Sequence, residues 1–350
     1  MSDKSQNIAI SNTWNKNLHY WLFLLISFFP VDTSAKLSEI NDTIINQNIE
    51  RIRWVAEFPL ETDSGKKGEV FSRIGAFFLG KKPPVISKPM AIIADEPGSF
   101  YVLDQESRLI IDVKDNKSEK PKAFNKIENN FPSLVATCLL PNGDLLFTDS
   151  SKGNIFLLTS DHKRILEFNE NDTLQQPTGI AYSKINDQVW VLETAADKIS
   201  IFNREGKFVR AIGKRGNANG EFNFPTHIWI DKDGLVYIND SMNFRVQIFD
   251  KEGNFVFVFG EIGDSSGYFA RQKGIATDSY GNIYVVDALF NTIQIFNRQG
   301  EFLYNFGARG REAGDFWMPN GIYIDQDDYI YIADSYNARV QIFQLVNGEN

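Results

Sequence analysis

The second half of the chain repeats itself with a fixed period, and this constrains the fold more than any other feature. Phenylalanines and acidic residues each recur every 47 positions: Phe202, Phe249, Phe296 and Phe343; Glu193, Asp240, Asp287 and Asp334. Residues 319–343, the clearest copy, hold three short runs of β-forming residues separated by turn-forming Asp, Asn and Ser. A period of this length with several strands in it predicts an array of small sheets.

The repeat can be followed back to residue 89 and gives six units. The first strands are predicted to start at Pro89, Pro132, Pro177, Pro225, Gln272 and Pro319, and the second strands to end at Asp104, Asp149, Glu193, Asp240, Asp287 and Asp334. Units three to five continue through a glycine-containing turn into a fourth strand, within 203–213, 250–260 and 297–307. The first two units are shorter and degenerate.

The last unit lacks a fourth strand, because the sequence ends at Asn350, soon after Phe343. A lone β-run at residues 52–59 precedes the repeats and is the strand that can fill this place. Small sheets arranged radially, with a strand from the other end of the domain closing the ring, leave no exposed edge. We therefore predict an all-β fold, a six-bladed propeller over residues 51–346, closed by an N-terminal strand.

The repeat motif resembles the NHL repeat, strongly from Pro177 and weakly before it. The matching residues are Gly220, Phe222, Pro225, Ile228, Asp231, Asp240, Ser241, Asn243 and 245–249, and again Gly314, Phe316, Pro319, Gly321, Asp325, Asp334, Ser335, Asn337 and 339–343. The resemblance implies a six-bladed propeller. It leaves the function open, because such propellers serve as RNA binders, protein-docking platforms, sensor domains and lyases.

Composition narrows the function classes. A net charge of −9 over 350 residues argues against a general phosphate-backbone binder, which needs clustered Lys and Arg. The single cysteine, Cys138, excludes an internal disulfide and a Cys-based zinc cluster. It lies in an apolar run, which predicts a core thiol.

The N-terminus has the features of an export signal. Residues 21–29 are apolar, Lys16 precedes them, and small residues at 33–35 offer a cleavage point. We interpret residues 1–35 as a signal peptide or, alternatively, an uncleaved N-terminal anchor or a buried segment, and residues 36–50 as a linker. The protein is then exported, periplasmic or extracellular, and membrane-anchored if the segment stays attached.

Residues 65–82 interrupt the strand pattern. Val70, Phe71, Ile74, Phe77 and Phe78 fall on one stripe of a helix, and lysines bracket them. The stripe predicts an amphipathic helical insertion. Its apolar face either contacts a membrane surface or a partner, or packs on the propeller.

The candidate ligand site lies at the mouth of the central channel. The loops entering the first strands place Thr178, Thr226, Lys273 and Asn320 there. His227 follows Thr226 and replaces the small residue that other units have at that position. An imidazole beside Lys273 suits an anionic or metal-bound ligand; alternatively, the ring fills a gap beside Trp229. The recurrent acids would share this face, and we interpret them as turn-stabilising groups of the repeat.

The residues that catalysis would need are not evident. The resembling propeller that cleaves hydroxyglycine peptides uses several zinc-bound histidines, whereas only His162 and His227 lie in this propeller, predicted at opposite faces. No nucleophile elbow, Walker loop or dinucleotide fingerprint is present. We predict a non-enzymatic binding or scaffold protein for a protein, peptide or glycan, with no cofactor, metal or catalytic residues.

Two alternatives stay open. One is a metal-dependent lyase or lactonase-type hydrolase on the same propeller. The other is an RNA-binding domain that uses the cluster Lys214, Arg215, Lys273, Arg309 and Arg311; nucleic acid is disfavoured by the net negative charge.

Overall fold

The computed structural model describes residues 51–59, 85–96, 98–126, 130–169 and 173–346. The chain divides into two compact units, one of residues 52–346 and one of residues 1–51 with 347–350. Of the second unit only the backbone of Arg51 and its place in a strand are described. The N-terminal segment 1–35, the linker 36–50 and the insertion 65–82 with Val70, Phe71, Ile74, Phe77 and Phe78 lie outside the described residues.

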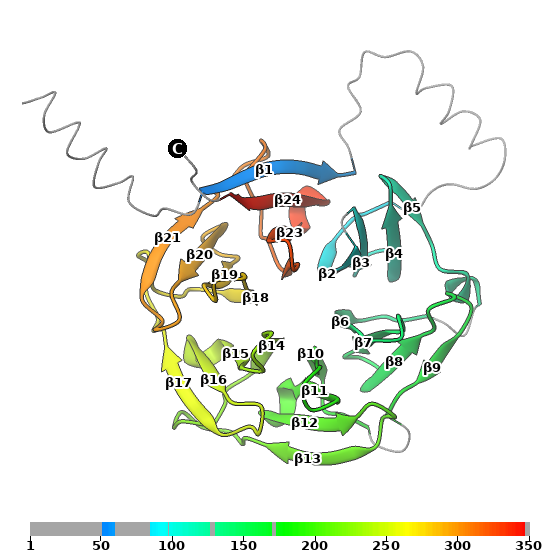
Figure 1. The fold of residues 1–350 in the computed structure, drawn as a ribbon, viewed down its shortest axis with the longest axis horizontal. Helices are drawn as coiled ribbons and strands as arrows, with labels where there is room; N and C mark the ends of the chain where they lie inside the picture. Colours follow the sequence, from blue (N-terminus) through cyan, green and yellow to red (C-terminus); the bar gives the residue numbers. More distant parts are fainter. Residues whose placement is uncertain (1–50, 60–84, 97, 127–129, 170–172, 347–350) are drawn as a thin grey trace, which may run out of the picture. The chain divides into compact units, whose positions relative to one another are not determined.

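Unit 52–346 is a six-bladed β-propeller, as predicted: six sheets of four strands surround a central channel (Figure 1). From the innermost strand outward, blades one to three are β2 (Pro89–Glu96), β3 (Ser99–Asp104), β4 (Leu109–Lys114), β5 (Lys117–Glu119); β6 (Leu134–Leu139), β7 (Leu145–Asp149), β8 (Asn154–Leu158), β9 (Ile165–Glu167); and β10 (Pro177–Ser183), β11 (Gln188–Glu193), β12 (Lys198–Asn203), β13 (Phe208–Ile212).

Blades four to six follow in the same order around the ring. They are β14 (Pro225–Ile230), β15 (Val236–Asp240), β16 (Arg245–Phe249), β17 (Phe255–Phe259); β18 (Gln272–Thr277), β19 (Ile283–Asp287), β20 (Thr292–Phe296), β21 (Phe302–Phe306); and β22 (Ile322–Ile324), β23 (Tyr329–Asp334), β24 (Arg339–Val346), β1 (Arg51–Phe58). Four 3-10 turns are present among the described residues: η1 (Lys122–Asn125), η2 (Thr194–Ala196), η3 (Ser241–Asn243) and η4 (Ser335–Asn337).

The predicted ends of all six second strands are confirmed, and two other expectations need correction. The first strands of blades two and six begin at Leu134 and Ile322, later than the predicted Pro132 and Pro319. Blades one and two also have a fourth strand, β5 and β9, each of three residues. These strands are short and largely exposed, so their sequences carry no alternation of apolar and polar residues.

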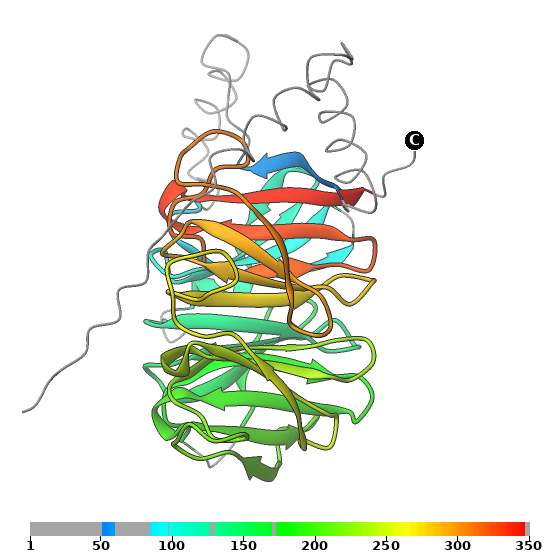
Figure 2. The ribbon, with the colours of Figure 1, turned by 90° about the vertical axis from the view of Figure 1, so that its left-hand side faces the viewer.

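The blades pack face to face, and this explains their different sequence patterns. Second strands such as β15 and β19 are buried at every residue because both of their faces meet a neighbouring blade. Outer strands such as β13 and β21 contain exposed residues, and Figure 2 shows strands crossing the thickness of the disc. Six apolar clusters form the core, one at each interface between neighbouring blades.

The glycine that follows the outer strand of blades three to five packs on the phenylalanine of the repeat motif. Phe222, Phe269 and Phe316 are fully buried, and their rings pack on Gly213, Gly260 and Gly307. A Cβ at these glycines would approach the rings to 2.3–2.4 Å, and their φ angles of 85–94° also favour glycine. Cys138 is buried in the core, as expected, and burial raises the pKa of its thiol.

The closing strand is the predicted one. β1 pairs with β24 at the outer edge of blade six, so the ring is closed by a strand from the start of the domain (Figure 1). Phe58 is 7% exposed and meets Phe100 of blade one edge-on at 6.0 Å. Glu57 forms an ion pair of 2.7 Å with Arg339. The strand therefore contacts blade six through its backbone and through side chains such as Glu57, and blade one through Phe58.

Candidate functional site

The six recurrent acids stabilise the loops at one face of the propeller, which we call the acid-end face. Each is buried at the end of a second strand, and all but Asp334 lie opposite the first residue of the neighbouring first strand. Asp104 accepts hydrogen bonds from the backbone N–H groups of Ser87, Lys88 and Ser107 at 2.6–2.8 Å. Asp287 likewise accepts from Ala270 and Arg271. The acids belong to the scaffold, as the sequence indicated.

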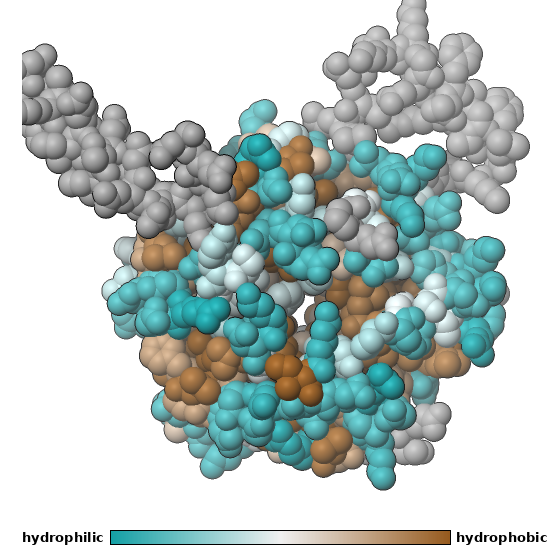
Figure 3. Space-filling model, in the orientation of Figure 1, coloured by the Kyte–Doolittle hydropathy of each residue, from teal (hydrophilic) through white to brown (hydrophobic). Residues whose placement is uncertain are grey.

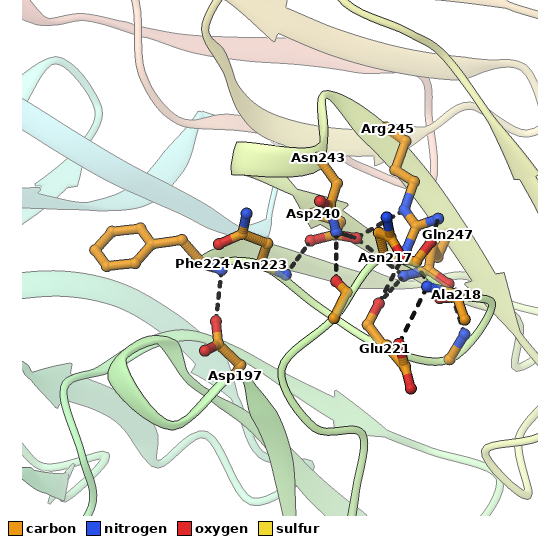
Figure 4. Close-up of polar contacts among 12 residues, drawn as sticks. Asp197, Asn217, Ala218, Glu221, Asn223, Phe224, Asp240, Asn243, Arg245 and Gln247 are labelled. Carbon is orange, nitrogen blue, oxygen red and sulfur yellow. Dashed lines mark hydrogen bonds and ion pairs between the residues drawn. The ribbon is translucent and has the colours of Figure 1, made fainter.

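Blade four shows this arrangement with an arginine added, as does blade six (Figure 4). Asp240 accepts from the backbone N–H of Asn223 at 2.7 Å and from the side chains of Asn243, Arg245 and Gln247 at 2.8–3.1 Å. The guanidinium of Arg245 also donates to three backbone carbonyls of the preceding inter-blade loop. One carboxylate thus joins a strand end, a turn and a loop.

The candidate residues occupy the rim of the channel at this face. Lys273 of blade five and Asn320 of blade six lie beside His227 of blade four, although 93 residues separate His227 from Asn320 in the sequence. Thr226 holds the other side of the imidazole, because its hydroxyl lies 3.0 Å from His227 Nδ1 and 2.6 Å from the Ser241 hydroxyl. The structure therefore brings Thr226, His227, Lys273 and Asn320 together.

Thr178 does not join this group of side chains at the rim. Its side chain is 7% exposed, and its hydroxyl lies 2.6 Å from that of Thr194, which in turn donates to the Pro225 carbonyl. The Ser150 and Ser335 hydroxyls donate to the carbonyls of Pro177 and Pro89 in the same way, across other blade interfaces. Thr178 contributes to the contact between blades three and four.

His227 is neutral in this setting. Burial first, and then the nearby Lys273 ammonium, lower its pKa to about 3, while the hydrogen bond with the Asn320 side chain acts in the opposite direction. A neutral imidazole has one N–H and one bare nitrogen. The ring can therefore donate to the Asn320 amide oxygen and accept from the Thr226 hydroxyl.

Lys273 is the unusual charge of the site. Burial, and secondarily Arg271, lower the pKa of its ammonium. Lys273 forms no ion pair or side-chain hydrogen bond within the part of the chain that the structure describes. Its backbone carbonyl is bound by the buried Asn239 amide, which holds this stretch of β18 against blade four. The rim therefore presents a partly buried ammonium with no carboxylate partner among the described residues.

The channel holds a cavity of about 800 Å³. Its lining runs from Met90, His227 and Gly274 near the acid-end face to the hairpins of the opposite face, where Asp95, Asp231, Asp278 and Asp325 lie. The space-filling view along the channel shows the surface hollowed at the centre of the ring (Figure 3). Of the five predicted residues, the cavity is lined by His227, while Thr178, Thr226, Lys273 and Asn320 lie nearer the acid-end face.

Two aromatic side chains of the cavity, Trp229 and Tyr323, were not among the predicted site residues. Trp229 of blade four meets Tyr323 of blade six edge-on at 5.7 Å, and its indole N–H donates to the Thr277 hydroxyl at 2.9 Å. The signal was present, because Trp229 and Tyr323 stand at one repeat position where blades three and five have Ala181 and Ala276. The small residue of blade five leaves room for the rings of blades four and six to meet.

His162 lies at the opposite face, as predicted, in the turn between β8 and β9. Its Nε2 lies 3.0 Å from the Tyr101 hydroxyl and its Nδ1 lies 3.5 Å from an Asp112 carboxylate oxygen. Burial raises the pKa of Asp112, while His162 lowers it. Within the described ranges no three His, Cys, Asp or Glu residues are grouped so that they could hold a metal ion, and no helix is long and apolar enough to cross a membrane.

Lowering the pH should test the environment of His227. Unfolded histidine has a pKa near 6.5, whereas the folded ring resists protonation down to about 3. The unfolded state therefore takes up a proton first, and the stability that neutral His227 contributes above pH 6.5 is lost as the pH falls toward 3, by up to about 1.4 kcal/mol per pH unit.

The measurement is denaturant unfolding between pH 4 and 8 for wild type and His227→Gly. Glycine is a fitting control because blades three, five and six have Gly179, Gly274 and Gly321 at this position. We expect the difference in unfolding free energy between the two proteins to depend on pH. Parallel curves would contradict a buried neutral imidazole.

A family model described as a 6-bladed beta-propeller, DUF5128, matches residues 165–243 and 276–349. The fold is that of a six-bladed β-propeller. The matched segments include all of blade three, the two inner strands of blade four, strands β19 to β21 of blade five and all of the last blade except β1, and they make up less than half of the chain. No curated protein sequence matches the chain significantly.

Solved structures of several activities share this fold. Virginiamycin B lyase from Staphylococcus aureus is 15% identical, with a TM-score of 0.54 over 76% of this chain and 99% of that one. An auxiliary nutrient binding protein from Bacteroides ovatus is 15% identical, with a TM-score of 0.60 over 85% and 78%. A gluconolactonase from Xanthomonas campestris is 12% identical, with a TM-score of 0.56 over 75% and 88%. At such identities the likeness concerns the fold alone.

Proposed function

We propose that this propeller is a non-enzymatic binding protein that holds a protein, peptide or glycan ligand by an anionic group at the acid-end mouth of its channel. The observation that carries the proposal is the ammonium of Lys273, which is partly buried, has no carboxylate partner among the described residues and adjoins His227 and Asn320. A carboxylate of a ligand would neutralise it and could bond the polar groups around it.

The surrounding residues suit this role. Neutral His227 and the Asn320 amide supply hydrogen-bonding groups without a competing negative charge. The repeat does not need a lysine at this position, because Thr178, Thr226 and Asn320 occupy it in blades three, four and six. A binding role also agrees with solved nutrient-binding proteins of the same fold.

Replacing Lys273 by threonine, the residue of blades three and four, should abolish ligand capture and leave the fold intact. The measurement is fluorescence binding of the purified protein to arrays of acidic peptides and of uronic-acid glycans. Lys207→Thr removes the same charge from an exposed outer turn and should bind as wild type does. If the Lys273→Thr variant still captures ligand on the arrays, the binding site does not include Lys273.

A second candidate is a metal-dependent lyase or lactonase-type hydrolase that works in the cavity. The volume of about 800 Å³ and the acidic residues at its far end favour it, and enzymes of both kinds are built on this fold. Stoichiometric zinc or calcium in the purified protein, together with turnover of a lactone or a depsipeptide, would favour the enzyme. RNA binding is weakened because Lys214 of the basic cluster is paired with Glu221 at 3.2 Å.

We propose three further properties from the sequence. The repeats are of NHL type, residues 1–35 direct export as a signal peptide or anchor, and the stripe within 65–82 contacts a membrane surface or a partner. They rest on the motif residues, on the apolar run at 21–29 and on helical spacing. Fractionation of cells expressing tagged protein would separate a cleaved from an anchored N-terminus.

A further inference from the structure

A group of aromatic and cationic side chains lies on the acid-end face between blades six and one. We call Lys88, Arg309, Arg311, Trp317 and Tyr336 the Trp317 cluster. The guanidinium carbons of Arg309 and Arg311 lie 5.9 and 5.4 Å from the centre of the Trp317 ring. Trp317 packs on Tyr336 at 5.8 Å, and the Lys88 ammonium lies 6.0 Å from the Tyr336 ring. Three cations thus surround two rings.

The repeat does not require these residues, as comparison of equivalent positions shows. At the positions of Arg309, Arg311, Trp317 and Tyr336, blade five has Ile262, Asp264, Ala270 and Leu289, and blade four has Arg215, Asn217, Asn223 and Met242. The same loops fold with all three sets. This combination of residues is therefore found in the last blade and not in blades four and five. Because the loops fold without it, these side chains can serve in binding.

The three cations have no carboxylate partner among the described residues. Lys214, in the corresponding loop of blade four, pairs with Glu221, and the buried Arg339 pairs with both Asp334 and Glu57. Within the described ranges Lys88, Arg309 and Arg311 form no such ion pair, although the chain as a whole carries a net charge of −9. A concentration of unpaired positive charge against this background indicates an anionic partner.

The cluster is exposed and adjoins the channel mouth. Tyr336 is 55% exposed, Arg309 and Arg311 are exposed, and Trp317 lies three residues before Asn320 in the same loop. The backbone N–H of Tyr336 donates to the Trp317 carbonyl at 3.0 Å, so the two loops that carry the rings are tied together. A segment bound at the mouth can continue across the rings.

The chemistry of these groups favours an acidic peptide. A guanidinium over an indole keeps its N–H donors available for a bidentate contact with a carboxylate, and stacking limits the entropy lost on binding. Trp317 is partly buried and Tyr336 is exposed, and Trp, Tyr and Arg together are typical of the strongest contacts in protein interfaces. A nucleic acid would need a longer basic track than three side chains supply.

We propose that the Trp317 cluster docks an acidic segment of a partner protein, with neighbouring Glu or Asp residues on Arg309 and Arg311 and the chain against the two rings. The inference rests on the proposed binding role of the acid-end face and names the partner's chemistry. Arg309 and Arg311 are two residues apart in one loop, which suits carboxylates that are close in the partner's sequence.

The test uses the full chain and a fluorescein-labelled peptide of four glutamates flanking one tyrosine. Binding is followed by fluorescence anisotropy in wild type and in Arg309→Ile/Arg311→Asn, which takes residues of blades five and four. We expect the double variant to bind at least tenfold more weakly. Arg215→Ile/Lys207→Asn removes two exposed charges far from these aromatic rings and should bind as wild type does.

Further measurements identify the class of partner that binds the cluster and distinguish lost binding from misfolding. Arg311→Glu should lose the glutamate peptide and gain affinity for the matching lysine peptide, a result that a misfolded protein would not give. Equal binding of heparin, polygalacturonate or oligo-uridine would overturn the proposal in favour of a general polyanion surface. Sedimentation showing self-association that the double variant loses would assign the surface to a second copy and also overturn it.

The test is separable from that of the proposed function. One outcome would refute the acidic-peptide inference and leave the binding function standing. In it, Arg309→Ile/Arg311→Asn binds the peptide as wild type does, while Lys273→Thr loses capture on the arrays. Peptide affinity lost in the double variant supports the inference whether or not Lys273→Thr changes the array result.

Discussion

Deleting residues 51–58 from the full chain is expected to unfold the propeller or to leave it insoluble. The deletion exposes the outer edge of β24 and removes Phe58 from the interface of blades six and one. Truncating a buried Phe alone costs about 3–5 kcal/mol, a large part of the 5–15 kcal/mol that typically stabilises a domain. Thermal unfolding followed by circular dichroism measures the effect.

A finer series separates the contributions of the closing strand. Phe58→Ala should lower the melting temperature strongly, whereas Arg53→Ala, which loses an exposed hydrogen bond to Gln344, should change it little. A synthetic peptide of residues 51–59 added to the deletion variant should restore folding by pairing with β24. A deletion variant that melts as wild type does would refute closure by β1.

Asp240→Ala is expected to destabilise the domain by about 3–5 kcal/mol, because it removes one partner from a buried ion pair. Asp240 is fully buried and accepts from four groups, of which Arg245 is the charged one. Without the carboxylate, the side chains of Asn243 and Gln247 and the Asn223 N–H also lose an acceptor (Figure 4). Urea unfolding measures the loss.

Two controls give this result its meaning. Asp233→Ala removes an exposed carboxylate that lies 3.6 Å from Arg298 and should cost less than about 1 kcal/mol. Asp287→Asn alters the equivalent acid of blade five, where Thr292 stands in place of the arginine, and should cost less than Asp240→Asn. Equal losses in these two Asn variants would show that the arginine adds nothing to the arrangement.

Much of the fold could be predicted because the same pattern of strands, turns and buried acids recurs in successive blades. The acids at 47-residue steps marked the ends of second strands, and the missing fourth strand of the last unit identified β1 as its replacement. β5 and β9 were missed, since a three-residue exposed strand has no periodic pattern to detect. The starts of β6 and β22 were misplaced, because Pro132 and Pro319 precede irregular backbone before pairing begins.

The site was less predictable, because it depends on contacts between blades. The sequence indicated that His227 departs from the repeat, but not that it bonds Asn320 of blade six. The sequence also could not show that the Thr178 hydroxyl is hydrogen-bonded at the interface of blades three and four, or that the rings of Trp229 and Tyr323 are in contact. Such contacts depend on the radius of the ring and on the size of the residue in the blade between, such as Ala276.

The pairing of β1 with β24 also shapes how the chain can fold. Arg53 and Gln344, which bond across this pair, are 291 residues apart in the sequence. Contacts so distant form late, because the entropy of closing the intervening loop must be overcome first. During synthesis β1 therefore precedes the other strands and pairs with β24 last, so its backbone edge stays unpaired for most of that time. Any factor that shields this segment until the last blade is complete would improve the yield of folded protein.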